Sequence, residues 1–190
     1  MNQPEIIEFK LLPALRECAL HQARMHSAWA EAVEFPALQE GSETLLTESQ
    51  IRTLDQLVFR FGKLQDAIGT RLLPAMLQLV QEWRDDEPFL DKLNRAEKLG
   101  VLPSVEQWQW LRELRNQTAH EYPDNPALTM ENLRRLVAHV PMLDELYKTW
   151  LASRMRVFLR FLHEFSQADS PLPDVISIAT FNVRKNYIPE

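Results

Sequence analysis

Apolar residues recur along most of the chain at the three-, four- and seven-residue intervals that place them on one face of a helix. The first such stripe covers residues 11–35 and predicts one helix, and residues 36–47 read as a loop. A second stripe, over residues 48–79, predicts a long helix. Because Pro74 lies inside it and cannot donate a backbone hydrogen bond, we expect a kink or a break there.

Two further helices are marked by their ends. Residues 88–99 predict a short helix that begins at a proline and is capped by Gly100. Ser104 and Gln107 form a capping-box pattern that opens the next helix, which Pro123 must end soon after residue 122.

The last long stripe begins near Thr129, the expected cap, and reaches residue 162, with Pro141 expected to bend or interrupt the helix. Residues 166–174 read as a linker, and residues 175–183 as a short strand or extended arm. Four principal amphipathic helices and a short one predict an all-α, antiparallel up-and-down bundle. We therefore expect one domain over residues 1–165, followed by a linker and a C-terminal arm over residues 166–190.

Composition narrows the classes of function. The chain has 190 residues and only 4 glycines, where an average chain carries about 7%. It contains no glycine-rich phosphate loop and no GxSxG elbow, so nucleotide-binding folds and hydrolases of those types lose their usual signals. Gly62 and Gly69 fall inside a predicted helix, where each costs up to about 1 kcal/mol relative to alanine. Close packing against another helix would explain why both are tolerated.

Charge and cysteine content add limits on partners and compartment. The net charge is -6, which argues against a non-specific nucleic-acid coat. Most of the deficit lies in residues 1–50, with three basic and eight acidic side chains, so a local basic cleft remains open elsewhere. Cys18 is the only cysteine, which excludes an internal disulfide and a multi-cysteine zinc site. Without a signal-peptide pattern or a membrane-length apolar run, we expect a soluble cytoplasmic protein with no membrane contact.

One segment, residues 111–123, concentrates chemically versatile side chains at the end of a helix. Asn116 and His120 lie about 40° apart around the helix axis, and Arg115 and Tyr122 about 20° apart. Arg115 and His120 diverge by about 140°, so one straight helix cannot easily direct both at one atom. Unwinding before Pro123, or a second subunit in a twofold dimer, would reconcile them.

These residue types suit phosphodiester cleavage without a metal or cofactor. A neutral histidine can remove a proton from a ribose 2′-hydroxyl, and an arginine can clamp phosphate oxygens and stabilise the transition state. His120 would be the base, Arg115 the stabiliser and Asn116 an orienting group, while Tyr122 offers a surface for an RNA base. The alternative is structural, because a histidine near a helix C-terminus can simply cap the last carbonyls.

The spacing of Arg115, Asn116, His120 and Tyr122 resembles the RX4HXY motif of the HEPN superfamily, particularly HepT-type toxins of prokaryotic toxin–antitoxin systems. The resemblance covers residues 48–150. It implies a homodimeric, metal-independent endoribonuclease with RNA as substrate and a nucleotidyltransferase as cognate antitoxin. In that branch the tyrosine matching Tyr122 receives AMP from the antitoxin. Some members are instead non-catalytic modules that bind a nucleotidyltransferase and its substrate, and a helical interaction protein without either activity is a third interpretation.

A second polar cluster, in the predicted helix over residues 48–79, consists of Arg60, Lys63 and Asp66. If it lies opposite the motif helix, Lys63 would add charge for a phosphate and Asp66 would hold Arg115 or His120. The alternative is a surface ion pair of little energetic consequence. The two helical glycines beside this cluster favour its belonging to the site.

Overall fold

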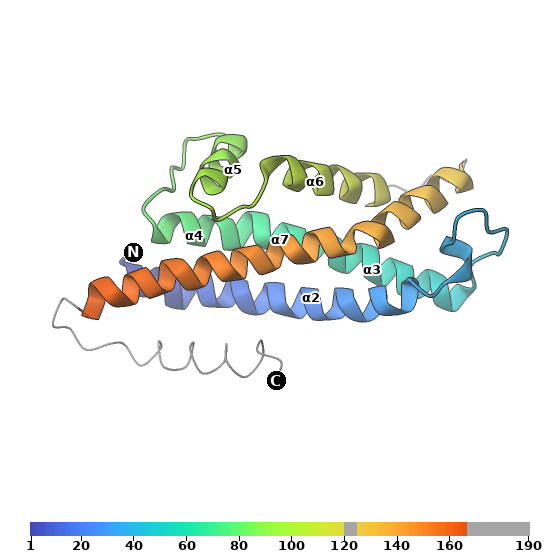
Figure 1. Ribbon diagram of the computed structural model, residues 1–190, viewed down its shortest axis with the longest axis horizontal. Helices are drawn as coiled ribbons and strands as arrows, with labels where there is room; N and C mark the ends of the chain where they lie inside the picture. The colour runs from blue at the N-terminus through green and yellow to red at the C-terminus, as the bar shows by residue number, and fades with distance from the viewer. Residues whose placement is uncertain (120–124, 167–190) are drawn as a thin grey trace.

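The computed structural model describes residues 1–119 and 125–166, and all regular secondary structure in those ranges is helical. Four long helical arms run alternately in opposite directions, with one short helix packed beside them (Figure 1). The antiparallel all-α bundle predicted from the sequence is therefore confirmed. In chain order the elements are α1 (Gln3–Ile6), the π-helical η1 (Ile7–Leu11), α2 (Leu12–Ala32), the 3₁₀ turn η2 (Pro36–Leu38), α3 (Glu48–Ala67), the π-helical η3 (Ile68–Leu72), α4 (Leu73–Leu79), α5 (Phe89–Lys98), α6 (Val105–Ala119) and α7 (Pro126–Ser166). The first arm consists of α1, η1 and α2, the second of α3, η3 and α4, the third of α6 and the fourth of α7, and the short helix beside them is α5.

The first arm begins eight residues earlier than predicted. Asn2 and Glu5 form a capping box, in which the Asn2 side chain accepts from the Glu5 N–H and the Glu5 carboxylate accepts from the Asn2 N–H, both at 3.0 Å. This cap satisfies backbone donors at the start of α1. Ile6 and Ile7 then pack into the core, which holds the extra turns against the bundle. The arm also ends at Ala32, earlier than predicted.

Pro74 does not end its arm; it changes the hydrogen-bonding pattern just before it. In η3 the N–H of Leu73 donates to the carbonyl of Ile68, five residues back, and α4 resumes ordinary helix with Pro74 in its first turn. η1 precedes Pro13 at the start of α2 in the same way, and the two π-helical segments contact each other. The expected kink or break is thus a short π-helical stretch, a known means of absorbing a proline or an inserted residue.

The start of α7 differs from the prediction. Asn125, not Thr129, is its cap, since the Asn125 side chain accepts from the N–H of Leu128 at 3.1 Å. Thr129 lies in the first turn and donates its hydroxyl to the Asn125 carbonyl. Asparagine is a preferred N-cap residue, and proline is preferred at the first position of a helix, so the Asn-Pro pair satisfies both preferences.

Pro141 does not interrupt α7, which is continuous from Pro126 to Ser166. Proline has no N–H to donate to the carbonyl four residues back, here that of Val137. The indole N–H of Trp29 on α2 donates to this carbonyl at 2.9 Å. A side chain from the neighbouring helix therefore replaces the lost bond and ties α2 to α7.

The predicted junction between α5 and α6 is largely confirmed. Gly100 follows the short helix with φ +67°, a left-handed conformation suited to a C-terminal cap. Ser104 accepts from the N–H of Gln107 at 3.2 Å, as a capping box requires. The first N–H of the helix, that of Val105, donates to the side chain of Glu97 on α5 at 3.0 Å. α5 therefore fixes the start of α6.

α3 is the central element, because it packs against α2, α6 and α7. Its buried face, which includes Leu57, Phe61 and Leu64, forms the middle of the core. Within the described ranges no helix has the combined length and apolar character needed to cross a membrane. The end of the motif helix after Ala119, and the linker and arm predicted beyond Ser166, lie outside the described residues.

The two helical glycines lie where the second arm meets α6, as their cost in a helix suggested. A Cβ atom on Gly62 would be 3.4 Å from Nε of Arg115, and one on Gly69 would be 3.0 Å from the ring of Trp108. The two glycines are seven residues apart, and so are their partners Arg115 and Trp108, in the reverse order along the chain. A single antiparallel alignment of the two helices therefore places both glycines against α6. The absence of a side chain at these positions lets α6 approach closely.

Gly69→Ala should lower the free energy of unfolding by about 1–2 kcal/mol, because the new methyl overlaps a ring that cannot move aside. Trp108 is buried and stacked on Trp150, with ring centroids 6.3 Å apart. Gly62→Ala is the matched control: it meets the flexible Arg115 at ordinary contact distance and should leave stability unchanged or raise it by up to about 1 kcal/mol. Urea titrations of both variants measure this, and equal effects would contradict the packing argument.

Candidate functional site

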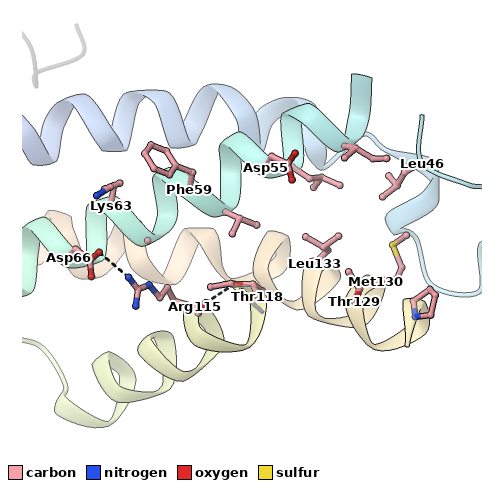
Figure 2. A pocket seen from close by; sticks show the side chains of 16 residues that line it. Leu46, Asp55, Phe59, Lys63, Asp66, Arg115, Thr118, Thr129, Met130 and Leu133 are labelled. Atoms are coloured by element: carbon pink, nitrogen blue, oxygen red, sulfur yellow. Dashed lines mark hydrogen bonds and ion pairs between the residues drawn. The ribbon is translucent and has the colours of Figure 1, made fainter. Parts of the chain in front are cut away.

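Arg115 lies on the side of α6 that faces α3, one turn after the buried Leu111. Its Nη2 donates to Oδ2 of Asp66 on α3 at 3.0 Å (Figure 2). Its Nη1 donates to Oδ1 of Asn116 at 3.3 Å. The predicted contact between Asp66 and Arg115 is therefore present. The arginine side chain is 35% exposed and the aspartate 48% exposed, so both remain accessible to a ligand.

α7 fixes the last turns of α6 behind Arg115. The side chain of Gln117 accepts from Arg135 at 3.1 Å, and its backbone carbonyl accepts from the buried Asn132 at 3.4 Å. The ring of Trp110 lies 4.4 Å from that of His139. These three contacts hold the rotation of α6 about its axis, and with it the direction of Arg115. No sequence signal indicates these contacts, because the α7 partners are scattered along a helix with no recognisable motif.

Arg115 and Asp66 stand at the polar end of a groove of about 830 Å³ between α3, the end of α6 and the start of α7 (Figure 2). Lys63 lines the same end. The rest of the groove is mostly apolar, with Leu46, Ile51, Leu54, Val58, Met130 and Leu133 along it. Two of the predicted supporting residues, Lys63 and Asp66, are thus brought to the groove together with Arg115.

The charge of the groove differs from the basic cleft that the sequence left open. Among its described lining residues, Lys63 and Arg115 are balanced by Asp55 and Asp66. The ion pair between Arg115 and Asp66 accounts for half of this balance. One copy of the chain therefore presents a neutral groove, and any attraction for a polyanion must come from cations outside it.

Arg60 is not brought to the groove. It points to α2, where its Nη1 lies 3.2 Å from Nδ1 of His21. A guanidinium can only donate, so Nδ1 must accept and the imidazole must be neutral with its proton on Nε2. This nitrogen is 3.8 Å from Glu17. The interface between α2 and α3 thus contains a polar cluster separate from the groove.

His120 and Tyr122, the remaining predicted site residues, lie outside the described residues. α6 is described to Ala119, directly before His120 in the chain. In the part of the chain that the structure describes, no group of three or more histidine, cysteine, aspartate or glutamate side chains is arranged to hold a metal ion.

Comparison with known proteins gives no match. No family model fits the chain, no curated protein is significantly similar to it in sequence, and no solved structure is significantly similar in fold. An assignment of function therefore depends on the groove residues and on the resemblance of the motif that follows them.

His21 should titrate below its ordinary range. Burial lowers its pKa, and the charge of Arg60 lowers it further, against the opposing effect of Glu17. Below about pH 6.5 the unfolded chain then binds more protons at this site than the folded chain does. The free energy of unfolding therefore decreases as the pH is lowered through that window. Wild type should lose more stability than His21→Gln between pH 7 and pH 5 in urea titrations. Arg60→Gln should raise the His21 pKa in an NMR titration; an unchanged value would contradict the role given to Arg60.

Proposed function

We propose that the chain is a metal-independent endoribonuclease of HEPN type, acting as a HepT-like toxin with a nucleotidyltransferase antitoxin in the cytoplasm. One observation carries the proposal: Arg115 of the RX4HXY-like motif is held by Asp66 and Asn116 at the accessible polar end of a groove. The helical bundle is the fold that the resemblance implies. A solvent-accessible, preorganised arginine is the group that phosphate recognition requires.

In the proposed reaction His120 removes the proton of a ribose 2′-hydroxyl. The 2′-oxygen then forms a bond to the adjacent phosphorus while the bond to the 5′-oxygen breaks, and the leaving oxygen takes up a proton. The products are a 2′,3′-cyclic phosphate and a 5′-hydroxyl. Arg115 neutralises the charge that builds up on the phosphoryl oxygens, and Asn116 orients it.

The ion pair with Asp66 is compatible with this role. Exposed pairs contribute only about 0.2–1 kcal/mol, so a phosphate can share or replace the carboxylate. A guanidinium has five N–H donors, of which Asp66 and Asn116 engage one each. The remaining donors can bind a phosphate while Asp66 keeps the plane of the group in place.

The proposal includes a homodimer. Arg115 and His120 diverge by about 140° around a straight helix, and a twofold axis beside α6 would bring one copy of each motif against the other. A second copy would also bring a second Arg115 and Lys63, each still accompanied by Asp66 and Asp55, so the dimer completes the catalytic pair without changing the charge balance of the groove. Attachment of AMP to Tyr122 by the antitoxin would place added negative charge beside the RNA path and silence the enzyme.

Arg115→Ala and His120→Ala should each lower RNA cleavage by at least about 100-fold, the typical cost of removing one transition-state or acid–base group. Arg112→Ala is the matched control, an exposed arginine three residues earlier whose guanidinium lies over Phe89. Wild type should cleave in EDTA and leave cyclic phosphate ends, and only it and Arg112→Ala should arrest growth when expressed. A requirement for divalent metal, or equal toxicity of all variants, would contradict the mechanism.

The charge balance of the groove favours one alternative. A neutral, largely apolar groove suits a protein partner, as in a non-catalytic HEPN module that docks a nucleotidyltransferase. In that case folded wild type would cleave no RNA, and a co-expressed nucleotidyltransferase encoded beside it would co-purify. Weak co-purification after Leu133→Glu, which charges the apolar part of the groove, would then identify the docking surface.

A further inference from the structure

Phe59 is a large aromatic side chain left exposed on α3, with 53% of its surface accessible. Two cations lie close to its ring: Cζ of Arg60 at 5.1 Å and Nζ of Lys63 at 5.7 Å from the ring centroid. Exposed phenylalanine costs free energy unless something covers it. With two cations beside it, the exposed ring offers both an apolar face and positive charge to a ligand.

Three basic residues extend this surface from α3 to α2. Arg60, Lys63 and Arg24 each form no ion pair with a carboxylate anywhere in the described part of the chain. All three lie near enough to His21 to lower its pKa, in addition to the effect of its burial. Two cations that form no ion pair lie beside one aromatic ring, and a third, Arg24, lies near His21, on a chain of net charge -6.

The carboxylates near this surface form ion pairs with other arginines or lie one helical turn away from the ring. Glu17, the acidic neighbour of His21, binds Arg71 at 2.7 Å. Asp66 binds Arg115, and Asp55 lies one turn before Phe59, away from Lys63. Asp55 lies on the same face of α3 as Phe59 but makes no ion pair with Lys63, so Arg60 and Lys63 keep donors that no carboxylate of the described residues engages.

The surface is continuous with the groove. Phe59 and Lys63 line the groove together with Arg115. Figure 2 shows Phe59 and Lys63 on one side of α3, with Asp66 and Arg115 on the side toward α6. A chain with its phosphate at Arg115 can therefore continue across Lys63 to the ring of Phe59, which Arg60 borders from the side of α2.

We propose that Phe59 is a stacking platform for a nucleobase, that Lys63, Arg60 and Arg24 contact the flanking phosphates, and that the ligand is single-stranded nucleic acid. The assignment rests on the proposed function and supplies its substrate class. Only an unpaired base can present its face to the ring, and an aromatic side chain set among cations is the arrangement that binds single strands. A protein partner is disfavoured because the centres of protein interfaces are depleted in lysine.

Binding is measured by fluorescence anisotropy with a fluorescein-labelled 12-nucleotide oligo(dT), which has no 2′-hydroxyl and cannot be cleaved by the proposed reaction. Phe59→Ala should weaken binding about 5- to 100-fold, and Phe59→Leu should weaken it similarly because leucine is apolar but cannot stack. Phe59→Trp should bind at least as tightly as wild type. Lys63→Gln and Arg24→Gln should each reduce the slope of log K against log salt by about 0.7.

The matched controls are Phe9→Ala, which removes a phenylalanine that is 63% exposed on η1, and Lys98→Gln on α5. Both should bind like wild type, and a duplex of the same length should bind more weakly than the single strand. Equal affinity of Phe59→Ala and wild type would overturn the assignment. So would full binding by Phe59→Leu, or a Phe59→Ala effect confined to self-association measured by ultracentrifugation.

These results separate the inference from the proposed function. If oligo(dT) binds with the expected dependence on Phe59 but RNA is not cleaved, the binding surface stands and the nuclease proposal fails. If RNA is cleaved and Phe59→Ala has an unchanged KM, the nuclease proposal stands and the platform fails.

Discussion

The closeness of α6 to the second arm is the constraint on which the site depends. Gly69 provides it, because a Cβ there would lie 3.0 Å from the ring of Trp108, while at Gly62 a Cβ would meet the flexible Arg115 at ordinary contact distance. Gly62 receives the stem of Arg115 and Gly69 the ring of Trp108. Since the pairs are seven residues apart on both elements, the register that packs the tryptophan also sets the arginine over Asp66. Core packing and site geometry are thus one arrangement.

Prolines shape the bundle without ending its helices. η1 and η3 both precede a proline and lie against each other, so the first two arms adapt at the same level. In α7 the carbonyl freed by Pro141 is bound by Trp29, and the adjoining face of α2 also supplies Gln22 and His26 to the buried Asp144. Burial raises the pKa of Asp144, but hydrogen bonds from Lys148, His26 and Gln22 outweigh this and hold it below its usual range. Polar side chains therefore join α2 to α7 where the backbone alone cannot.

The parts of the fold that follow from local chemistry could be predicted, and those set by tertiary contacts could not. Apolar spacing identified the long helices, and the cost of two helical glycines indicated close packing next to Asp66. The cap of α7 was misplaced because Thr129 and Asn125 are both good caps, and only the proline after Asn125 distinguishes them. Arg60 was grouped with Lys63 by spacing, and the two lie only about 60° apart around the helix axis, but Arg60 is the one that reaches His21 on α2.

That separation gives the two cationic residues different tasks. Lys63 belongs to the groove, whereas Arg60 fills the hydrogen-bonding need of a neutral His21 and still borders the ring of Phe59. Arg115 is balanced by Asp66, so it contributes direction more than net attraction. If the proposed nucleic-acid ligand binds here, its attraction would come from the unpaired cations at the edge and its selectivity from the arginine within. On an acidic chain this division limits non-specific binding, because only a ligand that reaches both the edge and the groove gains from each.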